Sequence, residues 1–188
     1  MVAGGEINVL EAGDKAARAV ILLHGMKFQA ETWWELGSLE YLAGAGFHVL
    51  GVDLPGFGKS PPGPASPAEV LKGVIDLYEL KEPVLLGPSM GGRVSLEFCL
   101  EHPDLLGALI LVGPVGVSEN LEEIGNIEIP VLGIWGELDT ISPLANGYLF
   151  QERIPECRLV VIDGAPHPCY LDNADRFHCE VEEFLRGL

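Results

Sequence analysis

The chain has 188 residues, of which 48% are hydrophobic, so it is too apolar for a disordered protein and its length suits one domain over residues 1–188. Its 28 acidic residues outnumber its 11 basic residues, and this balance argues against nucleic-acid binding, which needs a basic surface. No apolar run reaches the roughly 18 residues of a membrane span and residues 1–6 lack signal-peptide features, so we expect a cytoplasmic protein with no membrane partner.

Seven short apolar segments recur along the chain, and most are continuously apolar and rich in branched side chains. Such segments are typical of strands that are buried on both faces of a parallel sheet. In chain order, the expected strands cover residues 7–10, 19–23, 47–52, 83–86, 108–112, 131–135 and 159–162.

Helical patterns lie between the expected strands. Thr32 and Glu35 have the spacing of a capping box, and Ser66 and Glu69 have the same spacing ahead of an apolar stripe. Further helices are expected after residue 89, from residue 143 and over residues 177–188. This alternation predicts an α/β fold, with a mostly parallel central sheet of about seven strands and helices on both faces.

Residues 87–92 read Gly-Pro-Ser-Met-Gly-Gly and lie between an expected strand and an expected helix. A Gly-x-Ser-x-Gly pattern in this setting predicts a nucleophile elbow, in which small residues let a tight turn pass close to its neighbours. Ligands bind beyond the carboxyl ends of parallel strands, so Ser89 should be within reach of a substrate. The less specific interpretation is a Gly-rich turn that happens to hold a serine.

A nucleophilic serine needs a base near neutral pH, and the base needs an acid to orient it. His167 directly follows the last expected strand, and the other histidines fit the position of the base less well. Asp139 follows the strand over residues 131–135, with Glu137 as the alternative acid. We therefore expect Ser89, Asp139 and His167 to act as nucleophile, acid and base.

The tetrahedral intermediate of such a reaction needs hydrogen-bond donors for its negatively charged oxygen. One expected donor is the backbone N–H of Met90, directly after Ser89. The other is the backbone N–H of Met26, in the loop after the first long strand. Gly25 and Lys27 flank Met26, and we expect them to bind the substrate. The chain has no motif for a metal or a nucleotide, so no cofactor is expected.

Five motifs occur in the order found in α/β-hydrolases: His24-Gly25, residues 53–60, residues 87–92, residues 136–139 and His167. The chain resembles this family over essentially its whole length. Residues 24–28, 31–33 and 164–172 resemble the small lidless group around α/β-hydrolase domain-containing protein fourteen. The resemblance implies a Ser-Asp-His triad, activity on small aryl esters and a second activity that moves an acetyl group from protein lysine to coenzyme A. The Met-Gly-Gly of residues 90–92 has the common esterase form instead of this group's own variant.

Residues 113–130, between two expected strands, are too few to form the helical cap domain of larger relatives. We therefore expect an open site for short-chain or aryl esters. The leading hypothesis is a serine carboxylesterase that forms an acyl-serine, which water resolves. One alternative is an acyltransferase or protein-lysine deacetylase that passes the acyl group to coenzyme A, with Lys27 near its phosphates. Another is a non-catalytic interaction module that keeps the fold.

Overall fold

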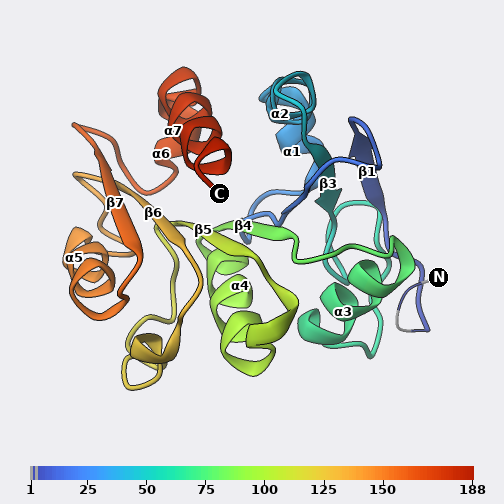
Figure 1. Ribbon diagram of the computed structural model, residues 1–188, viewed down its shortest axis with the longest axis horizontal. Helices are drawn as coiled ribbons and strands as arrows, with labels where there is room; N and C mark the ends of the chain where they lie inside the picture. The colour runs from blue at the N-terminus through green and yellow to red at the C-terminus, as the bar shows by residue number, and fades with distance from the viewer. Residues whose placement is uncertain (1, 3) are drawn as a thin grey trace.

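A seven-stranded sheet in the order β1-β3-β2-β4-β5-β6-β7 forms the centre of the computed structural model (Figure 1). The structure describes residues 2 and 4–188. Met1 and Ala3, which belong to the segment expected to lack signal-peptide features, lie outside the described residues. β1 runs antiparallel to β3, and the other neighbouring strands are parallel, which confirms the mostly parallel sheet. The strands are β1 (Val9–Ala12), β2 (Ala19–Leu22), β3 (His48–Val52), β4 (Val84–Pro88), β5 (Ala108–Val112), β6 (Val131–Gly136) and β7 (Cys157–Ile162).

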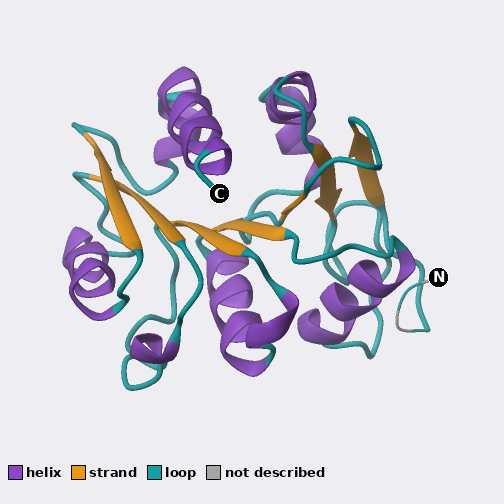
Figure 2. Ribbon diagram, viewed as in Figure 1, coloured by secondary structure: helices purple, strands orange, loops and turns teal. Residues whose placement is uncertain are grey.

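Helices cover both faces of the sheet, as predicted (Figures 1 and 2). One hydrophobic core joins the sheet to α3, α4 and α5, and a second core joins it to α1, α2, α6 and α7. Short 3-10 turns, η1 (Pro103–Leu105) and η2 (Ile124–Asn126), complete the elements. The helices are α1 (Ala30–Glu35), α2 (Ser38–Gly44), α3 (Pro67–Leu77), α4 (Met90–Glu101), α5 (Leu144–Arg153), α6 (Cys169–Asp172) and α7 (Ala174–Arg186).

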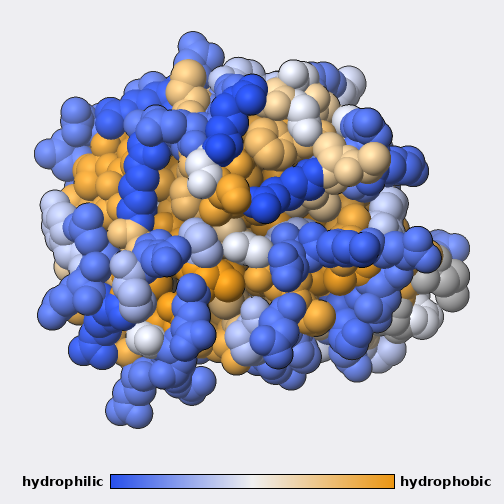
Figure 3. Space-filling model, in the orientation of Figure 1, coloured by the Kyte–Doolittle hydropathy of each residue, from blue (hydrophilic) through white to orange (hydrophobic). Residues whose placement is uncertain are grey.

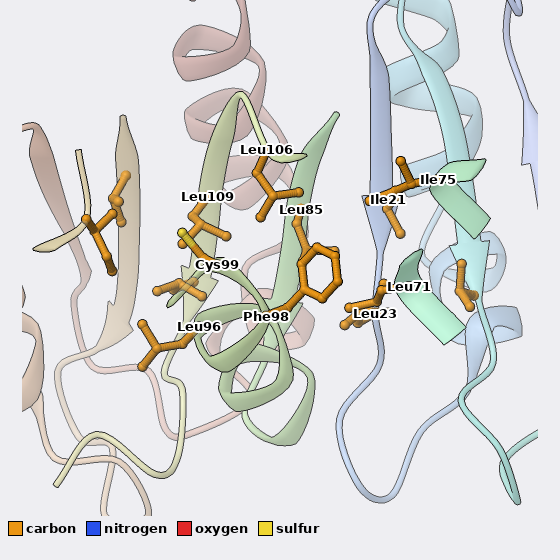
Figure 4. Packing of buried hydrophobic residues seen from close by; sticks show 14 of the residues in the cluster. Ile21, Leu23, Leu71, Ile75, Leu85, Leu96, Phe98, Cys99, Leu106 and Leu109 are labelled. Carbon is orange, nitrogen blue, oxygen red and sulfur yellow. The ribbon is translucent and has the colours of Figure 1, made fainter. Parts of the chain in front are cut away.

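The central strands are buried on both faces, which explains why they read as continuous apolar runs. Figure 4 shows Phe98 and Leu96 of α4 near Leu85 of β4 and Leu109 of β5, and all four side chains are buried. Each such side chain contributes about 1.5–3 kcal/mol on burial, so the packing fixes α4 firmly against the strands. The predicted catalytic side chains accordingly lie beyond the ends of the strands.

The start of α1 differs from the prediction. The Thr32–Glu35 capping box is wrong, because the helix already begins at Ala30, with Gln29 as its N-cap. Asp53, distant in sequence, accepts a hydrogen bond from the N–H of Ala30 at 2.6 Å and so satisfies one of the first donors of the helix. Thr32 instead accepts a bond from the N–H of Gln29 at 3.4 Å.

The capping box of α3 is confirmed. Ser66 N–H donates to Glu69 Oε2 at 2.7 Å, and Glu69 N–H donates to Ser66 Oγ at 3.2 Å. Between β5 and β6, residues 113–130 form turns and η2 without a separate cap domain, also as predicted. None of the helices in the described part of the chain is long and apolar enough to cross a membrane. Hydrophilic side chains cover much of the face seen in Figure 3.

Candidate active site

Ser89 lies in the tight turn between β4 and α4, the strand–turn–helix setting that the Gly-x-Ser-x-Gly pattern predicts. Its φ of 51° and ψ of −113° are uncommon for a residue other than glycine and mark a strained backbone. Ser89 N–H donates to the carbonyl of Val112 at 3.0 Å, and the carbonyl of Ser89 accepts from Arg93 at 3.0 Å and from Val115 at 3.2 Å. These bonds to α4 and to the end of β5 hold the turn in its strained form.

The glycines of the motif are required by close backbone contacts. A Cβ atom on Gly87 would lie 2.3 Å from the carbonyl oxygen of Gly91, and one on Gly91 would lie 2.7 Å from the carbonyl oxygen of His24. Neither distance is tolerated between nonbonded atoms, so larger residues would push the turn away from its neighbours. The spacing of the glycines thus follows from the shape of the turn.

Asp139 and His167 meet beyond the ends of β6 and β7. His167 Nδ1 lies 2.7 Å from Asp139 Oδ2, and the side chain of Asp139 is fully buried. Asp139 Oδ1 accepts hydrogen bonds from the N–H groups of Ile141 and Ser142, both at 2.8 Å. Because a carboxylate only accepts, Nδ1 donates to it, and in the neutral ring Nε2 then keeps a lone pair. This is the form of histidine that can take a proton from a hydroxyl.

Glu137, the alternative acid, does not contact the histidine. Its side chain is exposed and accepts a hydrogen bond from the N–H of Gly164 at 2.8 Å. The tight turn after β6 directs the two carboxylates to different partners, and only Asp139 is directed to His167.

His167 Nε2 is buried and finds no hydrogen-bond partner among residues 2 and 4–188. His167 and Ser89 line the same cavity, which has a volume of about 440 Å³. Hydrogen bonds between catalytic groups are commonly long in the absence of substrate. A buried imidazole nitrogen without a partner, beside a serine on a strained turn, is an arrangement suited to proton transfer from that serine.

The remaining cavity lining is mainly apolar, with five large side chains: Met26, Phe28, Val115, Ile141 and Tyr170. The ring of Tyr170 is buried, lies 5.1 Å from the ring of Trp33 between centroids and so joins the cavity to the core. Met26 and Ile141 are 68% and 63% exposed, so this part of the cavity wall faces solvent. A second cavity, of about 370 Å³, lies beside β1 and α1 and is lined by none of the predicted site residues.

The two expected oxyanion donors, Met26 and Met90, both line the cavity. Met90 opens α4, where the first N–H groups have no carbonyl partner within the helix. Gly25 lies against the serine, since a Cβ atom on it would be 3.8 Å from Ser89 Cβ. Lys27 also lines the cavity. All seven predicted site residues are therefore brought together, from segments far apart in the sequence.

His24 holds the loop that carries Met26. Its Nδ1 lies 2.9 Å from the carbonyl oxygen of Gly25, and its Nε2 accepts the N–H of Leu54 at 3.1 Å. Burial lowers the pKa of His24, so the ring is neutral at neutral pH. A fixed neutral ring keeps the loop beside Ser89.

Ser142 is a site residue that the sequence reasoning missed. Its N–H binds Asp139, and its Oγ donates to the carbonyl of Pro114 at 2.6 Å, which ties the loop after β6 to the loop after β5. The sequence carried a signal for Ser142, because an aspartate in a turn commonly accepts hydrogen bonds from the N–H groups two and three residues later. Tyr170 gave no such local signal. In the part of the chain that the structure describes, no group of three or more His, Cys, Asp or Glu residues is placed to hold a metal ion.

Comparisons with known proteins agree with this geometry. Residues 18–123 match a family model described as alpha/beta hydrolase fold. The chain is 35% identical over 189 aligned positions to ABHD14B of Homo sapiens, named as a candidate protein-lysine deacylase, and the match covers 96% of this chain and 89% of that protein. It is 36% identical to ABHD14A of Danio rerio, over 93% of this chain and 69% of that protein. A crystal structure described as a predicted CIB-like hydrolase from Thermoplasma acidophilum has a TM-score of 0.90 at 26% identity and covers 97% of this chain and 94% of that one.

Proposed function

The chain belongs to the α/β-hydrolase family of hydrolases, and we propose that it is a serine carboxylesterase acting on short-chain or aryl carboxylic esters. One observation carries the proposal. The His167–Asp139 bond of 2.7 Å leaves His167 Nε2 buried and without a partner among the described residues, in the same cavity as Ser89. This is the arrangement that a serine needs in order to be activated.

In the first half of the reaction, Ser89 Oγ attacks the ester carbonyl carbon while His167 Nε2 takes the hydroxyl proton. Asp139 stabilises the imidazolium that forms. The N–H groups of Met26 and Met90 donate to the oxygen that becomes negatively charged, and each such donor is worth about 10²–10³ in rate. The carbon–oxygen bond to the leaving alcohol then breaks, and the proton on Nε2 passes to that alcohol.

In the second half, water attacks the acyl-serine. His167 Nε2 takes a proton from this water and returns it to Ser89 Oγ as the acid leaves. The cavity of about 440 Å³ is partly open to solvent, and Met26 and Ile141 of its wall are exposed. This openness supports small acyl groups and exposed aryl leaving groups as substrates, because a partly open cavity of this volume buries only part of a long chain.

A second candidate function is the removal of acyl groups from protein lysine, which the name of human ABHD14B suggests. The open mouth of the cavity supports it, because the side chain of an acyl-lysine could enter while its peptide stays outside. The acyl-serine would be the same, and the amine of lysine would leave. Water would release the free acid, or the thiol of coenzyme A would take the acyl group and form a thioester.

The proposal is tested by hydrolysis of p-nitrophenyl acetate, butyrate and octanoate by wild type and Ser89→Ala, with and without coenzyme A. We expect turnover of the acetate and butyrate that is lost in Ser89→Ala, with less turnover of the octanoate. Equal activity in the variant would refute the assignment of Ser89.

Two further outcomes separate the alternatives. Faster release of p-nitrophenol with coenzyme A, together with formation of acetyl-coenzyme A, would favour acyl transfer to the thiol. An acetyl-lysine peptide offered in the same assay tests deacylation. Failure of wild type to turn over any of these esters or to react with a fluorophosphonate would favour the non-catalytic interaction module.

A further inference from the structure

Lys27 stands out in the cavity by its charge. Within the described residues, the lining includes no aspartate or glutamate and no lysine or arginine other than Lys27. The chain as a whole carries 28 acidic residues against 11 basic ones. An unopposed cation at the mouth of an apolar cavity, on so acidic a protein, gives this one site a local charge opposite to that of the molecule.

Within the part of the chain that the structure describes, Lys27 forms no salt bridge. The lysines that form salt bridges in the described part of the chain are Lys15, Lys59 and Lys72, and Lys27 is not among them. Its side chain is exposed, so its ammonium group can turn toward a bound molecule. The charge is therefore available to a ligand instead of being neutralised by the protein.

Lys27 lines the same cavity as Ser89, in the loop that passes beside the serine. Gly25 lies against Ser89, with a distance of 3.8 Å between its added Cβ and Ser89 Cβ. Two residues of extended chain span at most about 7 Å, so the Cα atom of Lys27 lies within that distance of the Cα atom of Gly25. Because Lys27 and Ser89 line the same cavity, one small molecule can meet Lys27 while its carbonyl lies at Ser89.

We propose that Lys27 is a specificity residue that selects small esters carrying an anionic group, most simply a carboxylate, a few bonds from the scissile carbonyl. The inference rests on the proposed esterase function and deepens it by naming the substrate class. Lys27 takes no part in proton transfer or bond breaking. It attracts the anionic group and so raises the fraction of substrate molecules that are held with their carbonyl at Ser89.

The test compares kcat/KM for matched anionic and neutral esters. On the leaving-group side the pair is 4-acetoxybenzoate and its methyl ester. On the acyl side the pair is mono-p-nitrophenyl adipate and its methyl ester, each corrected for its own rate without enzyme. The proteins are wild type, Lys27→Gln and Lys27→Glu. Lys81→Gln is the matched control, because Lys81 is exposed, forms no salt bridge among the described residues and lies at the opposite end of β4 from Ser89.

Lys27→Gln should lower the anionic-to-neutral ratio of kcat/KM by about fivefold in one of the pairs, the size of one exposed ion pair. Lys27→Glu should lower it further, because repulsion replaces attraction. Lys81→Gln should leave the ratio unchanged. High salt should shrink the wild-type ratio toward that of Lys27→Gln, since the Debye length falls to about 3 Å at 1 M. The pair that responds identifies the side of the ester that Lys27 meets.

Unchanged ratios in both Lys27 variants, with the neutral esters still hydrolysed, would overturn the inference and leave the esterase proposal standing. Equal loss on neutral and anionic esters would also overturn it, because it would make Lys27 a structural part of the loop. Absence of Ser89-dependent turnover of all four esters is a different result. It would overturn the proposed function, and this inference with it.

Discussion

Replacing Asp139 with asparagine tests how the carboxylate controls the histidine, because the change keeps the shape of the side chain and removes its charge. Asp139 Oδ1 accepts two N–H groups, from Ile141 and Ser142, at 2.8 Å each. The asparagine carbonyl has to take that position, since an amide NH₂ there would face two donors. The NH₂ group then faces His167 Nδ1, where Oδ2 now lies 2.7 Å away.

Two donors cannot share a hydrogen bond, so the ring proton of His167 moves from Nδ1 to Nε2. Nε2 is then unable to take a proton from Ser89. We expect kcat to fall by about 10⁴-fold, which corresponds to about 5.4 kcal/mol of lost transition-state stabilisation. KM should change little, because Asp139 does not line the cavity. The assay is initial-rate hydrolysis of p-nitrophenyl acetate at neutral pH.

Glu137→Gln is the matched control, since Glu137 is exposed and its side chain bonds to the N–H of Gly164, in the loop before His167. It should keep kcat within about twofold, as expected for a group outside the reaction. Both variants should unfold cooperatively on heating, with Asp139→Asn destabilised by about 1.5–3 kcal/mol for one lost charge-assisted hydrogen bond. An Asp139→Asn enzyme that keeps more than about a tenth of the wild-type kcat would refute the tautomer argument.

Three further predictions concern stability and the unused thiol. Gly87→Ala places a Cβ atom 2.3 Å from a backbone carbonyl oxygen of the elbow. It should lower kcat, and it should lower the free energy of unfolding in urea by about 1–3 kcal/mol. The control is Gly63→Ala, whose Cβ atom would have nothing within 4 Å, and it should leave kcat and the free energy of unfolding unchanged. Burial raises the pKa of the Cys169 thiol to about 12, so it stays protonated, and Cys169→Ser should keep kcat within about threefold. A loss above about tenfold would give the thiol a role. Burial lowers the pKa values of His24 and His178 below 6.5, so these histidines bind protons more readily in the unfolded chain than in the folded one. The free energy of unfolding should therefore fall as pH drops below 6.5. His178→Gln should flatten this dependence, and an unchanged slope in urea titrations would contradict it.

The central strands were predictable because burial on both faces leaves a simple pattern. β5 and β6 match their expected ranges to within one residue. The bounds of β1 were predicted less well, because the strand begins at Val9 instead of residue 7. As an edge strand it pairs only with β3, with Val9 opposite Val52 and Ala12 opposite Val49, so its bounds depend on the reach of that partner.

The start of α1 shows why local patterns were insufficient elsewhere. Thr32 and Glu35 have the right spacing for a cap, yet the helix begins earlier because Asp53 satisfies the N–H of Ala30. Trp33 adds a second distant tie, with its Nε1–H donating to the carbonyl of Leu23 at 3.0 Å. Neither contact can be read from neighbouring residues, because each joins segments that meet only after folding.

The proposed roles of Ser89, Asp139 and His167 came from their places shortly after recognisable strands. The sequence favoured Asp139 but kept Glu137 as an alternative acid, because both lie in the same short turn and only its backbone geometry separates them. The cavity wall was also beyond local reasoning. Tyr170 reaches it by packing on Trp33, a residue of another helix.

The most direct test of the account is to trap the covalent intermediate. Wild type and Ser89→Ala are mixed with p-nitrophenyl acetate, quenched with acid during turnover, digested and analysed by mass spectrometry. We expect one acetyl group on the wild-type peptide that contains Ser89, and none on the same peptide from the variant. Continued ester hydrolysis by wild type with no acetyl group on Ser89, or an acetyl group on another residue of an active Ser89→Ala protein, would contradict it.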